Sequence, residues 1–276
     1  MNATSIINND RLNYSGGVLN GDVSNSAGAT FGISGTGTRT VNGNVTNDGT
    51  VKVAGTADGT TVQFTGTFTN NGILDSDPAR LEFYGDFVIG PDGSIHASAG
   101  DQYVLYQDFL INSTSTTGWT TSAADLIFSG AGIHEFSFDG LDLTWNELLL
   151  EPDVILEFAG TGTFTASVLD GLMIDPDGHV LNLSGPAGFT LFYDPAENPD
   201  LSGVYWLQGG GSLSPSVIPV PGAVLLELVG LIGLTAARRR LRQSGETQRY
   251  SILSLRRERD KEDGGRKTGA SPQNAG

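Results

Sequence analysis

A glycine-centred repeat of about 22 residues constrains the fold of this chain more than any other feature. The unit reads apolar, any residue, Gly, any residue, Val or Phe, Ser or Thr, Asn. It occurs three times and once in a degenerate form, in the segments 19–31, 41–53, 64–76 and 83–95. The repeat glycines are 22, 23 and 19 residues apart, at Gly21, Gly43, Gly66 and Gly85. A repeat of this length is typical of one coil of a solenoid.

The composition of the repeat indicates strands. Val41, Val45, Val51 and Val53 alternate with other residues at the strand period of two, and β-branched residues are frequent throughout. Leucine-rich repeats have a similar period, but they need several leucines in each unit, which these segments lack. We therefore predict an all-β fold, a right-handed parallel β-helix or β-solenoid of about nine coils over residues 1–213.

Asparagines and glycines mark the predicted turns. Asn25, Asn47 and Asn70 hold the same place in successive units, which predicts a structural turn ladder of stacked side chains along the solenoid axis. We expect Gly28, Gly49 and Gly72, which follow them, to have positive φ. The two Pro-Asp-Gly sequences at 91–93 and 176–178 predict tight turns between strands, with glycine again at positive φ.

The charge of the chain divides into two opposite parts. The net charge is -16, but residues 1–210 hold 25 acidic and four basic residues, whereas residues 238–276 hold five acidic and 11 basic ones. Such an asymmetry indicates segments in different surroundings, and the acidic majority argues against binding to nucleic acid. A membrane between the two parts would account for the charge asymmetry.

An apolar stretch joins the two parts. Residues 222–237 are almost entirely apolar, although Glu227 interrupts them, and an arginine cluster follows at Arg238, Arg239, Arg240 and Arg242. We predict a single transmembrane helix at about 220–240, which reaches the needed length only with help from residues 217–220. By the positive-inside rule, the arginines set the topology and keep the C-terminal end cytoplasmic. The polar tail 243–276 is predicted to be disordered.

The segment 214–242 resembles a PEP-CTERM sorting signal. The resemblance is carried by Pro219, Val220 and Pro221, by the apolar stretch and by the arginines, although Val220 stands where the family usually has glutamate. The family implies recognition of the proline motif by an exosortase-type membrane protease in a Gram-negative bacterium. It further implies export of the acidic part beyond the inner membrane, membrane anchoring or secretion, and exopolysaccharide as a partner.

The first residues carry no export signal. Residues 1–17 have no basic stretch, apolar stretch or cleavage site of a secretory signal peptide. A sorting signal needs an export signal, so we expect one upstream of Met1. Asn8 and Asn9 resemble the second half of a repeat, and we expect the solenoid to be N-terminally incomplete.

No catalytic, cofactor or metal site is predicted. Cysteine is absent, and the three histidines are far apart, so surface or turn positions are expected for them. Three pairs of aspartates are interpreted as solvated turns: Asp75 with Asp77, Asp139 with Asp142, and Asp175 with Asp177. Two aromatic clusters, at 103–119 and 192–206, are interpreted mainly as core residues, with sugar stacking as the alternative.

These observations favour a non-enzymatic, exported structural or adhesin-like protein at the cell surface or in a biofilm matrix. The first alternative is a lyase or glycosidase on the same fold. It is disfavoured because residues 1–210 have four basic side chains with which to bind anionic polysaccharide. The second alternative is an autotransporter-like adhesin passenger, which is disfavoured because residues 214–276 show no group of alternating strands.

Overall fold

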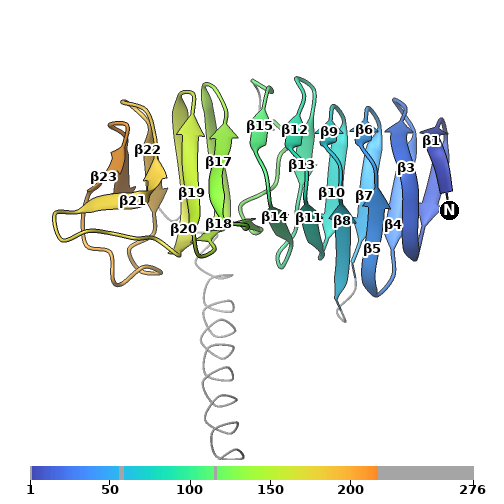
Figure 1. Ribbon diagram of the computed structural model, residues 1–276. Helices are drawn as coiled ribbons and strands as arrows, with labels where there is room; N and C mark the ends of the chain where they lie inside the picture. Colours follow the sequence, from blue (N-terminus) through green and yellow to red (C-terminus); the bar gives the residue numbers. More distant parts are fainter. Residues whose placement is uncertain (1, 56–58, 115–116, 217–276) are drawn as a thin grey trace, which may run out of the picture. The chain divides into compact units, whose positions relative to one another are not determined.

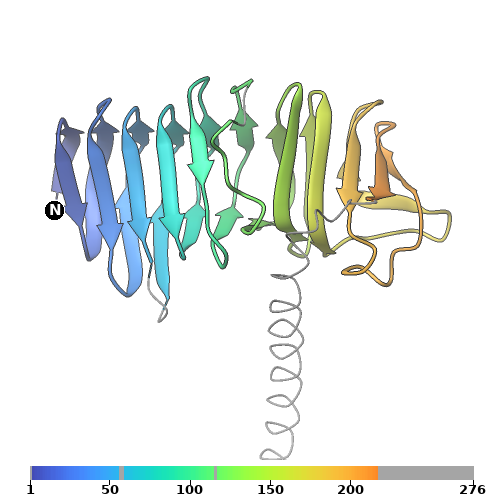
Figure 2. The same ribbon diagram turned by 180° about the vertical axis from the view of Figure 1, so that it is seen from behind.

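A computed structural model of the chain describes residues 2–55, 59–114 and 117–216. These residues form one all-β unit, a β-solenoid of about 9 turns. The coils follow one another in chain order, from β1 (Asn2–Asn8) at one end to β23 (Tyr205–Gln208) near the other (Figure 1). Figure 2 shows the same order from behind. The prediction of an all-β solenoid with about nine coils is confirmed.

Three faces run along the solenoid, and each coil contributes a strand segment to most of them. Face 1 contains β5 (Gly37–Asn42), β8 (Thr60–Phe64), β11 (Arg80–Phe83), β14 (Gln102–Leu105) and β16 (Asp125–Phe128). Face 2 contains β1, β6 (Val45–Asn47), β9 (Phe68–Asn70), β12 (Phe87–Ile89), β15 (Phe109–Ile111), β17 (Gly132–Ser137), β19 (Val154–Ala159), β21 (His179–Ser184) and β23. Face 3 contains β2 (Arg11–Tyr14), β4 (Thr30–Ser34), β7 (Thr50–Ala54), β10 (Ile73–Asp77), β13 (Ser94–His96), β22 (Thr190–Tyr193) and β24 (Ser212–Pro215).

Three long strands turn from one face to the next. β3 (Gly17–Asn25) passes from face 1 to face 2, whereas β18 (Leu141–Leu150) and β20 (Gly162–Asp170) pass from face 3 to face 1. Neighbouring coils pair in parallel, as expected for a solenoid in which each strand returns one coil later. β23 and β24 instead pair antiparallel and close the last described coil.

Phenylalanines fill the interior. Successive coils on face 2 place Phe68, Phe87, Phe109, Phe136 and Phe158 in register. The rings of Phe87 and Phe109 stack at 4.8 Å between centroids, and those of Phe109 and Phe136 stack at 4.7 Å. The inward positions of each strand therefore join into one continuous dry core along the axis.

The asparagines form a buried column at the turn between faces 2 and 3. Asn25 Nδ2 donates to Asn47 Oδ1 at 2.7 Å, and Asn47 Nδ2 donates to Asn70 Oδ1 at 2.7 Å. Asn8 extends the column, since its Nδ2 donates to Asn25 Oδ1 at 2.7 Å. Each amide also donates to a backbone carbonyl of the next coil, as Asn47 does to Ile73 at 3.0 Å. The column thereby satisfies polar groups that lie inside the core.

We expect Asn47→Ala to lower the free energy of unfolding by about 2 kcal/mol, because both of its amide partners lose a buried hydrogen bond. Urea unfolding of the full chain measures this change. Asn112→Ala, at an exposed asparagine, is the control. A loss no larger than that of the control would show that the column contributes nothing to stability.

Close approach between coils explains the repeat glycines. A Cβ atom on Gly43 would lie 2.6 Å from the carbonyl carbon of Gly21, and one on Gly66 would lie 2.7 Å from that of Gly43. The same contact recurs between Gly85 and Gly66, at 2.6 Å. A side chain at Gly43, Gly66 or Gly85 would collide with the backbone of the preceding coil. We define these four residues, Gly21, Gly43, Gly66 and Gly85, as the glycine column.

The predicted positive φ is confirmed at Gly28 and Gly178, with φ of 79° and 82°, but it is wrong at the other glycines of the predicted turns. Gly49 and Gly72 have no positive φ. They are needed for the same reason as the glycine column, since a Cβ on Gly72 would lie 2.1 Å from the Gly49 carbonyl oxygen. Gly93, in the first Pro-Asp-Gly turn, likewise lies against the carbonyl of Asn70.

Candidate functional site

The residues predicted to act in sorting lie outside the described part of the chain. These are Pro219, Val220 and Pro221, together with Arg238, Arg239, Arg240 and Arg242. The predicted transmembrane helix at 220–240 and the tail 243–276 also lie outside it. Within the described residues, no helix is long and apolar enough to cross a membrane. The candidate sites below are therefore sites of the solenoid.

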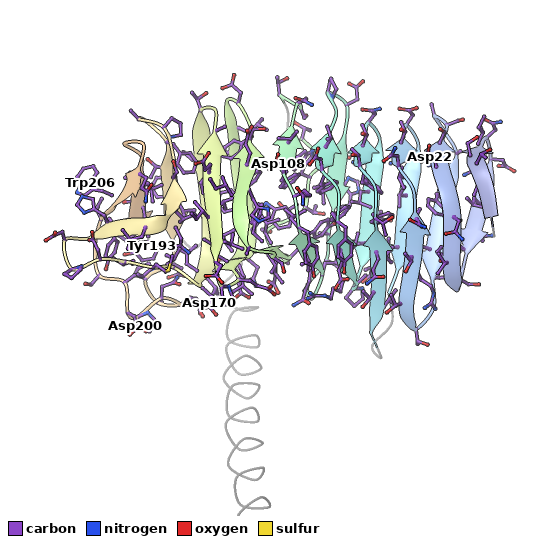
Figure 3. All side chains as sticks on the ribbon, in the orientation of Figure 1. Asp22, Asp108, Asp170, Tyr193, Asp200 and Trp206 are labelled. Atoms are coloured by element: carbon purple, nitrogen blue, oxygen red, sulfur yellow. The ribbon has the colours of Figure 1, made fainter. Side chains whose placement is uncertain are left out.

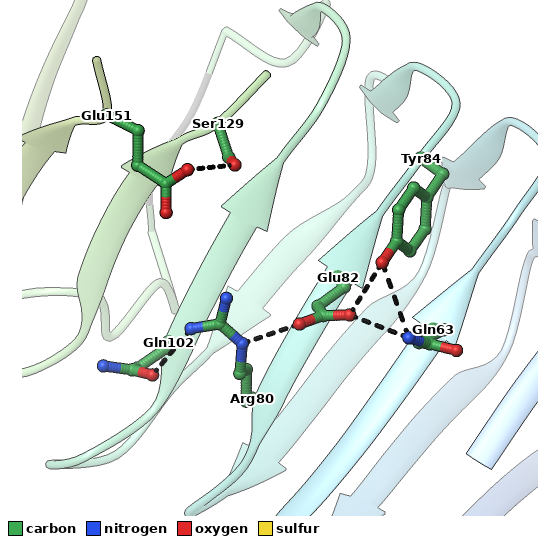
Figure 4. Close-up of polar contacts among 7 residues, drawn as sticks. All are labelled: Gln63, Arg80, Glu82, Tyr84, Gln102, Ser129 and Glu151. Carbon is green, nitrogen blue, oxygen red and sulfur yellow. Dashed lines mark hydrogen bonds and ion pairs between the residues drawn. The ribbon is translucent and has the colours of Figure 1, made fainter. Parts of the chain in front are cut away.

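A polar column runs along the outer side of face 1 (Figure 4). Arg80 Nε donates to Glu82 at 2.7 Å, and Gln63 Nε2 donates to the other Glu82 oxygen at 3.0 Å. Arg80 also donates to Gln102 at 3.2 Å, so the column links three coils. Burial raises the pKa of Glu82, but hydrogen bonds from Arg80, Gln63 and Tyr84 outweigh it and lower the pKa below its ordinary value. Glu82 is thus a paired, ionised carboxylate.

Two tyrosines stack beside this column. The rings of Tyr84 and Tyr106 lie 4.3 Å apart and nearly parallel, and Tyr84 Oη donates to Glu82 at 3.1 Å. Burial and the neighbouring Glu82 raise the pKa of Tyr84. A Cβ atom on Gly130 would lie 3.5 Å from Cδ1 of the Tyr106 ring. Each ring covers one face of the other while Tyr84 stays 38% exposed, and we interpret the pair as a coil-to-coil contact.

The predicted aromatic clusters divide into core and surface residues. Tyr103, Phe109 and Tyr193 are buried, as expected for core residues. Trp206, near the C-terminal end of the described solenoid, is 56% exposed (Figure 3). Trp119 is half-buried and lines a depression on face 3. Among the accessible residues of these clusters, Trp119 and Trp206 therefore have the largest rings.

The predicted carboxylate pairs make local contacts rather than converging on one site. Asp75 pairs with Lys52 at 3.0 Å, and Asp175 pairs with His179 at 3.4 Å. Asp139 and Asp142 each accept a hydrogen bond from a threonine of the next coil. Among the described residues, no group of three or more acidic or histidine side chains could hold a metal ion.

One histidine differs from its prediction. His134 is buried rather than exposed, and its Nε2 lies 2.8 Å from the carbonyl oxygen of Gly130. His134 lies within β17 on face 2, at an inward position of the strand, beside Phe128. Its position therefore follows from core packing.

A buried aspartate was missed by the sequence analysis. Asp101 is fully buried and accepts hydrogen bonds from the backbone N–H groups of Ala79 and Ser98, each at 2.6 Å. The Ser76 hydroxyl donates to it at 2.9 Å and also contacts Tyr103 Oη. Burial raises the pKa of Asp101, although the backbone and serine hydrogen bonds act in the opposite direction. This carboxylate holds the loop before β14 to the preceding coil.

The raised pKa predicts a pH dependence. The folded state binds a proton at Asp101 more readily than the unfolded chain, so this group favours folding at low pH and the benefit is lost as pH rises through the folded pKa. Compared with Asp101→Asn, the wild-type protein should lose stability between about pH 4 and pH 7. Urea unfolding of both proteins at the two pH values measures the difference. A difference that does not change with pH would contradict the prediction.

Two shallow depressions lie on the described surface. One, of about 230 Å³, is lined by Trp119, Ser122, Asp142 and Thr144 among others. The other, of about 330 Å³, has mainly apolar walls that include Leu149, Pro152 and Met173. Three carboxylates also line the second depression, Glu151, Asp153 and Asp170.

The three carboxylates of the second depression have separate surroundings. Glu151 accepts a hydrogen bond from Ser129 at 2.5 Å (Figure 4), and Asp170 accepts one from the backbone N–H of Gly171 at 2.7 Å. Asp153 occupies the left-handed region, with φ of 67°, which is uncommon for a residue other than glycine. Within the described chain, no hydrogen bond joins any two of the three.

No family model, curated protein or solved structure matches this chain. The fold places the chain in the class of β-solenoids. Its function has to be argued from the residues on the faces of the solenoid.

Proposed function

We propose that this chain is an exported structural protein, adhesin-like, that acts at the surface or in the extracellular matrix of a Gram-negative bacterium. The observation that supports this proposal most is the uninterrupted dry core of the solenoid. The polar groups on the outer side of the solenoid largely bind neighbouring coils. Such a surface is stable and repetitive, and it is strongly acidic, with 25 acidic against four basic residues in 1–210. A structural role needs these properties and no catalytic centre.

The proposed route to the surface rests on the C-terminal sequence. In this proposal, an exosortase-type protease recognises Pro219 and Pro221, and the arginines at 238–242 keep the far end in the cytoplasm. The described part of the solenoid reaches Ser216 in the sequence, since its N–H still donates to the Tyr193 carbonyl oxygen at 2.7 Å. Little chain therefore separates the last coil from the proposed processing site.

Deletion of 217–242 tests the proposal in the bacterium that makes the protein. We expect the deletion to abolish membrane retention and processing, and Pro219→Ala with Pro221→Ala to block processing alone. Pro272→Ala, in the tail, is the matched control. Mass spectrometry of the membrane, periplasmic and secreted fractions measures both effects. A wild-type protein of unprocessed mass, or processing and location of the Pro219→Ala, Pro221→Ala variant like those of the wild type, would refute the sorting signal.

The second candidate is a polysaccharide-active enzyme, and the depression lined by Glu151, Asp153 and Asp170 is the observation in its favour. Glycoside hydrolysis generally uses two carboxylates on opposite sides of the bond. Release of reducing ends from neutral and acidic glycans, lost in Glu151→Gln and Asp170→Asn but kept in Asp139→Asn, would establish it. Absence of turnover in the wild-type protein would leave the structural role.

A further inference from the structure

The first depression lies where face 3 is interrupted. The five-stranded sheet of this face runs from β2 to β13 and stops there. In the next coil, the face is represented only by an isolated bridge between His96 and Thr120. The strand segments resume one coil later with the first half of β18. The depression of about 230 Å³ therefore occupies the one described coil in which face 3 has no strand.

Trp119 forms an aromatic wall of this depression. Its Nε1 donates to the carbonyl oxygen of Gly93 at 3.1 Å, and its ring contacts the hydrophobic core. The indole is therefore held in place, and its polar atom is satisfied without a ligand. A fixed aromatic ring at the edge of a surface depression suits stacking against a flat, weakly polar partner.

Hydroxyl groups and one carboxylate line the same depression. Asp142 accepts from Thr163 with one oxygen, and the other has no hydrogen-bond partner among the described residues. The hydroxyls of Ser122 and Thr144 likewise have none there, while Thr121 is bound to the Thr144 carbonyl at 2.7 Å. The depression thus offers an aromatic surface, donors and acceptors close together.

The ligand class follows from this chemistry. Among the described residues, no lysine or arginine lines the depression, and Asp142 lies in it, so a uronic acid or a phosphate would be repelled. A single carboxylate is a poor cation site, because hard cations take several oxygen ligands. Neutral sugars combine an apolar ring face with hydroxyls. Pockets for larger ligands hold about 300–1,000 Å³, so this one suits a single ring.

We infer that this depression, formed by Trp119, Ser122, Asp142 and Thr144, binds one sugar ring of a neutral polysaccharide. The sugar stacks on Trp119, and its hydroxyls bind Asp142 and the two hydroxyl side chains. Binding here is not catalytic, since glycoside hydrolysis would need a second carboxylate. The inference deepens the proposed function and rests on its matrix association, but export and sugar binding can be measured separately.

Calorimetric titration of the purified full chain in detergent micelles tests the inference. The probes are cellohexaose, mannohexaose and isomaltohexaose, with hexagalacturonate as the acidic comparison. We expect saturable binding of at least one neutral probe and none of hexagalacturonate. Trp119→Ala and Asp142→Ala should each weaken binding at least tenfold. Trp206→Ala and Asp139→Ala, which alter a tryptophan and a carboxylate elsewhere, should leave it unchanged.

Three results would overturn the inference: no saturable binding of any neutral probe, tighter binding of hexagalacturonate, or unchanged binding by both site variants. Thermal unfolding of each variant separates lost binding from lost folding, and Asp142→Ala removes an exposed side chain that the core does not need. A protein that binds sugar but stays unprocessed would contradict the sorting proposal alone, and the reverse result would contradict the sugar site alone.

Discussion

Replacement of Gly66 by alanine is expected to lower the free energy of unfolding by about 4 kcal/mol or more. The added Cβ would lie 2.7 Å from the carbonyl carbon and oxygen of Gly43 and 2.5 Å from Asn44 Oδ1. Two of these three atoms belong to the backbone of the preceding coil and cannot move without separating paired strands. Gly66 has no positive φ, so the loss would come from the collision alone.

Gly16→Ala is the matched control for this substitution. Gly16 has no positive φ, and a Cβ there would meet no atom within 4 Å. Urea unfolding of the two variants and the wild type measures the difference. If Gly66→Ala were no less stable than Gly16→Ala, the coils could not be as closely spaced as described.

Phe109→Ala has the second large expected effect, a loss of about 3–5 kcal/mol. Phe109 is fully buried, and its ring stacks between those of Phe87 and Phe136, so truncation opens a cavity in the middle of the core. Solenoid coils contact only their neighbours, which limits how far the core can rearrange to fill it. The cost should therefore be near the upper end of the range.

Ile133→Ala controls for loss of apolar volume, since Ile133 is 64% exposed on the outer side of face 2. Its expected effect is within about 0.5 kcal/mol. Thermal and urea unfolding measure both variants. Equal effects of the two substitutions would contradict the continuous aromatic core.

The repeat made the solenoid predictable. Spacing alone placed Asn25, Asn47 and Asn70 at one position of successive coils, because a coil of constant length returns equivalent residues to one column. Only one of the two structural reasons for the glycines could be predicted from the sequence. Positive φ is a property of one residue and can be guessed from a turn sequence, whereas the contact of Gly72 with Gly49 exists only between coils.

The remaining features depend on contacts that the repeat does not encode. The spacing between equivalent phenylalanines varies from 19 residues, between Phe68 and Phe87, to 27, between Phe109 and Phe136. The spacing therefore does not show which outer residues become neighbours in the irregular coils. Tyr84 and Tyr106 are 22 residues apart, one repeat length, so the repeat could have indicated their stack. The depression at Trp119 was hidden for another reason, since it arises where a strand of face 3 is missing.

The central claim is that the solenoid lies outside the inner membrane. Labelling of single cysteines in spheroplasts of the native bacterium tests this claim most directly. The chain has no cysteine, so Ile133→Cys on the solenoid and Ser271→Cys in the tail are unambiguous reporters, each placed in the Pro219→Ala, Pro221→Ala variant so that processing does not remove the tail. An impermeant maleimide should label Ile133→Cys in intact spheroplasts and Ser271→Cys only after lysis. Labelling of Ile133→Cys only after lysis would contradict the account.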